Sequence, residues 1–146
     1  MINDTTIKRL NDEGYVMING REAFDVPSLQ PLYAQMYWAN TRPAEIIEKS
    51  LDHSLLYGVE KNGKIVAFSR WVTDYATYAY LCDVIVDEAH RGKGLAKWML
   101  SEALSRPDLS TMRRLSLVTQ DAHGVYEAFG FKLIEHAERY MELFRG

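Results

Sequence analysis

A short basic turn with two glycines is the part of this chain best suited to bind an anion. The segment Arg91-Gly92-Lys93-Gly94-Leu95-Ala96 follows an apolar run at Val84–Val86 and precedes apolar residues at helical spacing. The first amides of a helix lack partners within it, and the helix dipole adds about half a positive charge there. Glycines allow a ligand to approach the backbone closely, and Lys97 adds charge to that of the turn. The turn therefore predicts a site for a pyrophosphate.

Two common phosphate-binding motifs do not fit this turn. In the P-loop a Lys and a Ser or Thr accompany the last glycine, whereas Leu95 follows Gly94. The dinucleotide fingerprint G-x-G-x-x-G requires a third glycine where Lys97 stands, and it normally opens a domain. A nucleotide triphosphatase and a Rossmann-type enzyme are therefore disfavoured.

The elements that must position this turn can be read from the spacing of apolar residues and from turn signals. Asn62-Gly63 predicts a tight hairpin, because both residues tolerate positive φ. The strand before the basic turn, the helix after it and the next strand form a βαβ unit, whose strands should be parallel.

The expected strands are 15–18, 55–60, 64–72, 78–86, 115–119, 131–134 and 140–144. The expected helices are 26–37, 42–50 capped by Thr41, 96–104 stopped before Pro107, and 122–129 capped by Asp121. We therefore expect a mixed α/β sheet with helices on its faces, closed by antiparallel strands.

Length and composition limit the class of protein. With 146 residues, 47% of them hydrophobic, residues 1–146 should form a single domain. The net charge of −3 gives no general footprint for nucleic acid. The single cysteine, Cys82, excludes an internal disulfide, and no Cys/His run has the spacing of a metal site. No export signal or apolar run of about 18 residues is present, so we expect a cytoplasmic protein without a membrane or metal partner.

Two motifs in this chain resemble those of the GNAT superfamily of acyl-CoA-dependent N-acyltransferases. Arg91, Gly94 and Ala96 occupy the specified places of its cofactor motif [QR]-x-x-G-x-[GA]. The segment Tyr126–Phe131 is similar to the family's Y-x-x-x-G-F. The resemblance implies an α/β (α+β) fold with a mostly antiparallel central sheet, a splayed parallel pair of strands and flanking helices.

The resemblance also implies where acetyl-CoA would bind. The backbone of Val84, Ile85 and Val86 would pair with the pantetheine arm. The pyrophosphate would be held by the N–H groups of the turn, that is by Arg91, Gly92, Lys93, Gly94, Leu95 and Ala96. Thr119 stands where the family often has a cofactor-binding Asn, and its hydroxyl can still donate a hydrogen bond.

Candidate catalytic groups follow from the chemistry of acyl transfer to an amine. Tyr126 would stand near the sulfur, and a phenol with a pKa of about 10 can protonate a leaving thiolate. The resemblance implies a slot between the two splayed parallel strands, where acetyl-CoA would lie. Asp83 is on the strand that enters this slot, out of phase with Val84 and Val86; it would be either the base for the amine or a salt-bridged Asp. His123, one helical turn before Tyr126, is either a second base or a surface histidine. Tyr37 and Trp38 would help to shape the acceptor pocket or simply pack in the core.

The resulting hypothesis is an N-acetyltransferase that carries an acetyl group from acetyl-CoA to a primary amine of a small molecule or peptide, by direct attack in a ternary complex. A non-catalytic acyl-CoA-binding sensor or partner module on the same fold remains the alternative. A homodimer is possible, since dimers are frequent among similar proteins. The acceptor and the acyl-chain preference are left open by the sequence.

Overall fold

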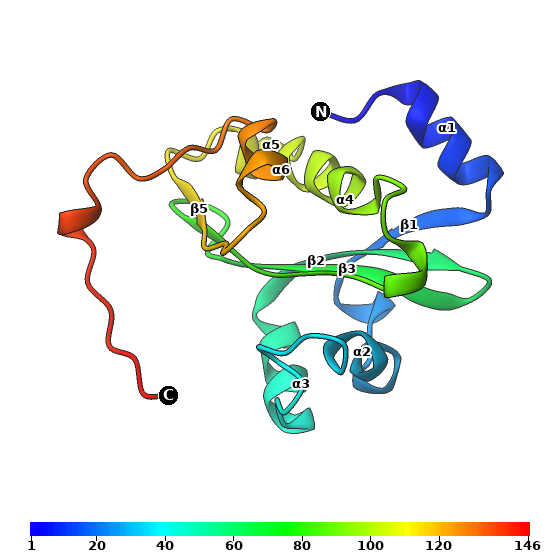
Figure 1. Ribbon diagram of the computed structural model, residues 1–146, viewed down its shortest axis with the longest axis horizontal. Coiled ribbons are helices and arrows are strands. Elements are labelled where there is room, and N and C mark those ends of the chain that lie inside the picture. The colour runs from blue at the N-terminus through cyan, green and yellow to red at the C-terminus, as the bar shows by residue number, and fades with distance from the viewer.

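The computed structural model describes residues 1–146 as a five-stranded sheet between two groups of helices (Figure 1). The strands lie in the order of the sequence: β1–β4 are antiparallel, and β5 is parallel to β4. This confirms the predicted mixed sheet with one parallel pair. The strands are β1 (Tyr15–Asn19), β2 (Ser54–Lys61), β3 (Lys64–Thr73), β4 (Ala79–Val86) and β5 (Leu115–Leu117).

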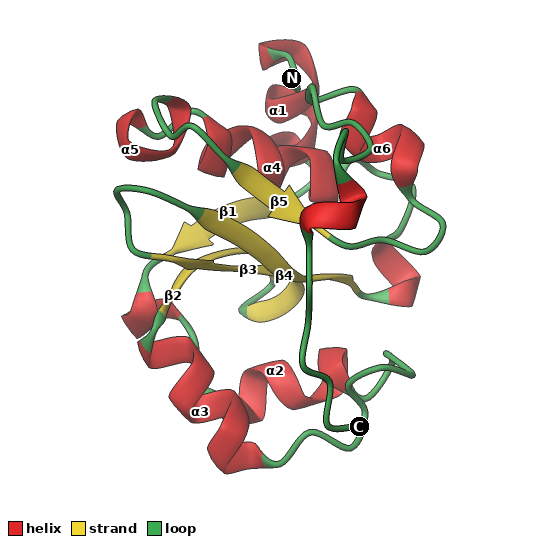
Figure 2. Cartoon of the chain, turned by 90° about the vertical axis from the view of Figure 1, so that its left-hand side faces the viewer, coloured by secondary structure: helices red, strands yellow, loops and turns green.

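The helices cover both faces of the sheet (Figure 2). One face carries α1 (Asp4–Asp12), α4 (Leu95–Leu104), α5 (Pro107–Ser110) and α6 (His123–Glu127). The other carries α2 (Val26–Tyr33) and α3 (Ala44–Asp52). Single 3-10 turns lie at Arg21–Ala23, Glu88–His90 and Ala137–Arg139. None of the helices is long and apolar enough to cross a membrane.

Each face of the sheet has its own apolar core. Against α4, the larger core includes Trp71, Leu95 and Met99. Against α2 and α3, the smaller core includes Phe68 and Ile85. The sheet is therefore buried on both sides, which fixes the register of its central strands.

The hairpin between β2 and β3 forms as the sequence predicts. Asn62 and Gly63 have φ of 54° and 76°, the left-handed values that a two-residue type I′ turn requires. Lys61 therefore pairs directly with Lys64.

A β-bulge at Cys82 changes the direction of the side chains along β4. Arg70 pairs with Asp83 and Trp71 with Leu81, so Cys82 is the extra residue. Before the bulge Leu81 belongs to the core under α4, whereas after it Val84 and Val86 take that face. Asp83 consequently turns with Ile85 towards α2. The parallel pairing to β5 also ends at Leu81, where β5 itself ends at Leu117.

Several predicted elements differ from the observed ones at their ends. The polar segment Asp4–Asp12 forms a helix capped by Asn3, which the sequence analysis did not predict. The predicted helix 26–37 ends at Tyr33. The prediction that Thr41 caps the next helix is wrong, because Pro43 is the N-cap and no side chain bonds the first amides.

The predicted closing strands 131–134 and 140–144 are also wrong. Neither segment pairs with the sheet, because β5 has no partner on its outer side and the chain after α6 leads away from the layers (Figure 1). Strand pairing requires a neighbour within about 5 Å in the hydrogen-bonding direction, and the extended segment 140–144 has none.

Candidate functional site

The basic turn presents a row of free backbone amides. Gly92 and Gly94 have φ of 77° and 95°, values that residues with a side chain rarely adopt. Gly94 is the N-cap of α4. The first hydrogen bond of the helix runs from the Trp98 N–H to the Gly94 carbonyl, 3.0 Å. None of the N–H groups of residues 91–97 donates a hydrogen bond within the chain. A helix N-terminus without a side-chain cap is a ready anion site.

Contacts to the carbonyls of the turn hold it in place without using those amides. Arg9 of α1 donates from Nη2 to the Lys93 carbonyl at 2.9 Å, and Arg91 donates from Nε to the Val86 carbonyl at 3.1 Å. The side chains of Arg91, Lys93 and Lys97 form no ion pair. The turn is thus braced on one side and carries uncompensated positive charge on the other.

The strand that leads into the turn has a free edge where the cofactor arm was expected. Beyond the bulge, Asp83–Val86 pairs with β3 on one side and has no strand on the other. Val84 and Val86 are half-buried on the α4 face, and Ile85 is buried on the opposite face. The geometry leaves backbone groups of this segment available for an extended ligand.

Tyr126 lies on α6 beside an apolar pocket. Its ring packs edge-to-face on Phe131 with centroids 6.2 Å apart, and its hydroxyl makes no hydrogen bond within the chain. Burial raises the pKa of this phenol above its ordinary value. Tyr126 and the exposed His123 both line a pocket of about 450 Å³ between β5, α6 and residues 131–137. The structure therefore brings these two residues to one opening, as their spacing suggested.

Thr119 is engaged at the start of α6. Its Oγ1 accepts the Ala122 N–H at 3.0 Å, and its side chain also lines the pocket of Tyr126. The prediction that Asp121 caps this helix is wrong, because Ala122 is the N-cap and no side chain bonds the first amides of the helix. The Thr119 hydroxyl accepts in its bond with Ala122, so its own hydrogen stays available for donation.

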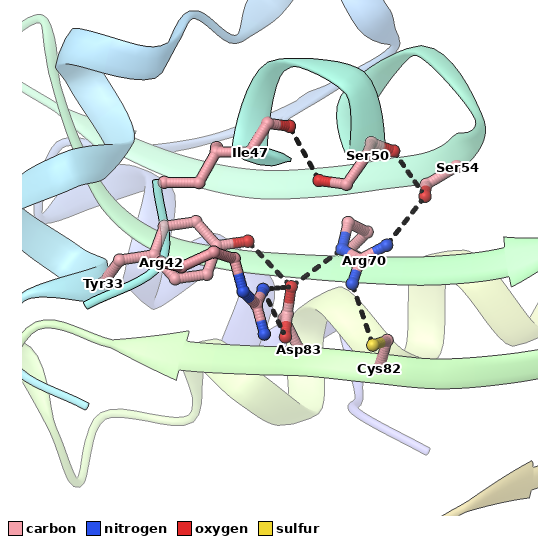
Figure 3. Close-up of polar contacts among 8 residues, drawn as sticks. All are labelled: Tyr33, Arg42, Ile47, Ser50, Ser54, Arg70, Cys82 and Asp83. Carbon is pink, nitrogen blue, oxygen red and sulfur yellow. Dashed lines mark hydrogen bonds and ion pairs between the residues drawn. The ribbon is translucent and has the colours of Figure 1, made fainter. Parts of the chain in front are cut away.

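Asp83 lies at the centre of a buried polar cluster (Figure 3). One carboxylate oxygen accepts the Tyr33 hydroxyl and the Arg70 Nε, each at 2.7 Å, and Arg42 Nη1 at 3.2 Å. Of the two interpretations of Asp83, the salt-bridged one agrees with this geometry. Burial and the Asp83 charge raise the pKa of the Tyr33 phenol, so this residue remains a donor.

The cluster extends from Arg70 to the single cysteine. Arg70 Nη2 donates to the Cys82 sulfur at 2.8 Å, and its Nη1 donates to the Ser54 hydroxyl at 3.1 Å (Figure 3). Burial, followed by the Asp83 charge, raises the pKa of the Cys82 thiol. The bulge thus places both Cys82 and Asp83 within reach of one guanidinium.

The loop after α2 approaches the loop after β5 across the open end of the strand pair. The Tyr37 hydroxyl donates to Gln120 Oε1 at 2.8 Å, and the Arg42 guanidinium lies over the ring of Trp38 at 5.8 Å. Sequence analysis missed Arg42, Arg70 and Gln120. Arg70 faces Asp83 in the β3–β4 register, so a correct register with the bulge could have revealed this pair, whereas no local signal identifies the other two.

Comparison with known proteins is consistent with this geometry. A sequence model of the acetyltransferase (GNAT) family matches residues 21–131. A GNAT-family protein from Xanthomonas campestris pv. campestris, known from its crystal structure, is 36% identical, with a TM-score of 0.84 over 90% of this chain and 93% of that one. A protein of Gibberella zeae, named as a candidate acetyltransferase, is 33% identical over 107 residues. The match covers 59% of this chain and 59% of that relative's length.

More distant structures share the fold alone. An aminoglycoside N-acetyltransferase solved in complex with CoA is 15% identical, with a TM-score of 0.66 over 90% of this chain and 94% of that one. A GNAT-family protein from Streptococcus pneumoniae is 20% identical, with a TM-score of 0.73 over 90% of this chain and 98% of that one. Since the family pattern spans residues 21–131 and the same fold recurs in these structures, this chain belongs to the acetyltransferase (GNAT) family, whose members use acetyl-CoA.

Proposed function

We propose that this protein transfers an acetyl group from acetyl-CoA to a primary amine of a small molecule or peptide, by direct attack of the amine in a ternary complex. The observation that carries the proposal is the row of unpartnered amides at residues 91–97, next to a strand edge that is free beyond Leu81. A pyrophosphate fits such amides, and an extended arm fits such an edge. Acetyl-CoA contains both parts and supplies the thioester.

In this proposal the residues of the turn bind and Tyr126 moves a proton. The amides of Arg91 to Ala96 hold the pyrophosphate, and the backbone of Val84 to Val86 orients the arm below it. The Tyr126 hydroxyl, which has no partner in the chain, protonates the leaving thiolate. Because burial raises its pKa, the phenol keeps this proton at neutral pH.

Two groups are candidates to accept the amine proton, and their surroundings differ clearly. Asp83 already accepts hydrogen bonds from Tyr33, Arg70 and Arg42. We therefore propose that Asp83 acts by fixing Arg42 and Tyr33 beside the slot, and accepts a proton only by way of water. His123 is exposed, has no hydrogen-bond partner in the chain and shares the pocket with Tyr126, so its imidazole is the freer base.

A binding assay combined with a release assay tests the proposal. Titration calorimetry with acetyl-CoA is expected to show one site per chain, and the Lys93→Gln variant is expected to bind more weakly. Release of free thiol is then measured with a panel of primary amines. Binding without release for every amine would favour the non-catalytic sensor, and absence of binding would contradict both functions.

A further inference from the structure

Arg42 brings more positive charge and more N–H donors to the Asp83 cluster than the cluster uses. All three guanidinium nitrogens of Arg70 donate hydrogen bonds within the cluster. Arg42 donates from Nη1 alone, to the two Asp83 oxygens at 3.4 and 3.2 Å (Figure 3). Asp83 is the one carboxylate that pairs with these two guanidiniums, and both of them are always charged. The cluster therefore has one positive charge in excess.

The unused donors of Arg42 form the side-on edge of its guanidinium, and solvent reaches them. Nε and Nη2 of Arg42 donate no hydrogen bond within the chain. Among buried side-chain nitrogens and oxygens, only the indole N–H groups of Trp71 and Trp98 lack a partner. Since neither nitrogen of Arg42 is among these buried atoms, and 23% of its side chain is exposed, a ligand can approach this edge.

Two aromatic rings hold the Arg42 guanidinium in place. Its Cζ lies 5.3 Å from the centroid of the Tyr33 ring and 5.8 Å from that of the Trp38 ring. These cation–π contacts act together with the bonds to Asp83. A side chain that is already held loses less conformational entropy when a ligand binds to it. The free edge of Arg42 is therefore a preorganised donor pair.

The loop between α2 and α3, which carries Arg42, is bonded to the segments that follow both parallel strands. The Gln35 side chain accepts the N–H of Glu88, after β4, at 3.0 Å. The Tyr37 hydroxyl donates to the loop after β5 at 2.8 Å. Asp83, the partner of Arg42, is the first residue of the β4 edge that has no strand beside it. Arg42 therefore lies next to the edge on which the acyl-carrying arm is proposed to bind.

We propose that Arg42 binds a carboxylate of the acceptor, so that the acceptor is a small amine that itself carries a carboxylate, the class to which free amino acids belong. The inference rests on the proposed acetyl transfer. Parallel N–H groups at Nε and Nη2 match the two oxygens of a carboxylate. The single negative charge of that group balances the single excess charge of the cluster. The same excess charge would repel a polyamine. Asp83 and Tyr33, which hold Arg42, are positioning residues in this arrangement.

Matched acceptors test the class of substrate. Thiol release from acetyl-CoA is measured with glycine, β-alanine, γ-aminobutyrate and L-phenylalanine, each compared with its own carboxamide. The native protein is expected to favour an acid over its carboxamide by about ten-fold or more in kcat/KM, the size of effect that a charge-assisted hydrogen bond gives. A carboxamide lowers the pKa of the neighbouring amine, so this preference cannot come from a larger share of free amine. Equal use of acids and carboxamides, or faster use of O-phosphoethanolamine than of every acid, would overturn the inference and leave acetyl transfer standing.

Variants of Arg42 show whether this residue causes the preference. Arg42→Gln removes the charge and the donor pair, and the preference for the acid is expected to fall to within about two-fold. Arg42→Lys keeps the charge without the planar fork and should recover only part of the preference. Arg113→Gln is the matched control, because Arg113 is exposed between α5 and β5 and forms no ion pair. A preference that survives unchanged in Arg42→Gln would overturn the inference.

A spectroscopic titration tests the same contact without turnover. The Nε signal of Arg42 in a ¹⁵N–¹H spectrum is assigned by its loss in Arg42→Lys. With CoA present, the acids are expected to shift this signal, and their carboxamides are expected to leave it in place. No shift with any of the acids would overturn the carboxylate site. A shift with the acids, combined with no thiol release from any amine, would support the carboxylate site and contradict acetyl transfer.

Discussion

Tyr126 is the residue on which the proposed chemistry depends, and burial sets its protonation state. Its pKa lies above the ordinary value of about 10, so the group is a protonated donor throughout the neutral and mildly alkaline range. A general acid is useful as long as it keeps its proton. The loss of turnover that results from ionisation of Tyr126 is therefore expected only above about pH 10.

Replacing Tyr126 with Phe should lower kcat by about 100-fold or more, the usual contribution of a general acid, with the Kd of acetyl-CoA changed by less than about two-fold. The reason is that the hydroxyl makes its interaction in the transition state. Steady-state kinetics and calorimetry measure the two quantities. Tyr75→Phe, on the exposed turn after β3, is the control and should change neither. Unchanged kcat in Tyr126→Phe would remove the residue from the mechanism.

Asp83 should contribute mainly to stability. Asp83→Asn leaves Arg70 buried without its carboxylate, and breaking a buried pair costs about 3 kcal/mol in free energy of unfolding. Urea denaturation measures the difference. Asp12→Asn removes the exposed Lys8–Asp12 pair of α1 and should cost at most about 0.5 kcal/mol. Equal losses in the two variants would show that the cluster is not the stabilising unit inferred here.

The sequence could place Asp83 on a strand but could not show which groups surround it. Its partners Arg70 and Arg42 lie 13 and 41 residues away along the chain. Contacts at that separation depend on strand register and helix packing, which no local pattern encodes. An anion site at Arg91, Gly92 and Gly94, in contrast, could be predicted from the sequence, because backbone conformation and charge are local properties.

At the scale of elements, the shape of the turn before α4 depends on the left-handed backbone conformation of Gly92. Gly92 and Gly63 have almost the same φ, 77° and 76°, and an added Cβ would meet no atom within 4 Å at either position. Replacing each with Ala should therefore cost a similar free energy of unfolding, about 1 kcal/mol, from the left-handed conformation. Only Gly92→Ala should also weaken acetyl-CoA binding, measured by calorimetry. Equal affinities in the two variants would exclude a role for this turn in binding.

The elements that sequence patterns predicted well are those fixed by short-range chemistry. The Asn62-Gly63 hairpin and the stop of α4 before Pro107 follow from allowed backbone conformations. The bulge at Cys82 was missed because it depends on pairing with β3. The helix Asp4–Asp12 was missed because its sequence is largely polar; Leu10 is its buried residue, and the helix packs against β1 and braces the turn through Arg9.

At the scale of the whole molecule, acetyl-CoA should raise the melting temperature, because a ligand that binds only the folded state stabilises that state by mass action. Differential scanning fluorimetry over about a hundred-fold range of acetyl-CoA concentration measures the rise. Lys93→Gln, which is expected to bind more weakly, should show a smaller rise at the same acetyl-CoA concentration. No rise at millimolar acetyl-CoA would contradict the proposed binding.

Residues 131–134 and 140–144 show what a sequence pattern leaves open at this scale. Their composition predicted strands, and the structure has none there. A run of apolar residues indicates that a segment suits a sheet, but it does not indicate whether the path of the chain brings a neighbouring strand beside it. Here the chain after α6 leads away from the layers (Figure 1).

The arrangement around Cys82 has a practical value for the assay that tests the function. Reagents that detect free coenzyme react with thiolates, and every such assay suffers from the protein's own sulfhydryl groups. Here there is a single one, half-buried, hydrogen-bonded by Arg70 and with a raised pKa. The signal from the protein's own thiol is therefore expected to develop slowly and to stop at one equivalent per chain. Free coenzyme released by the proposed reaction can then be followed continuously with the thiol reagent present.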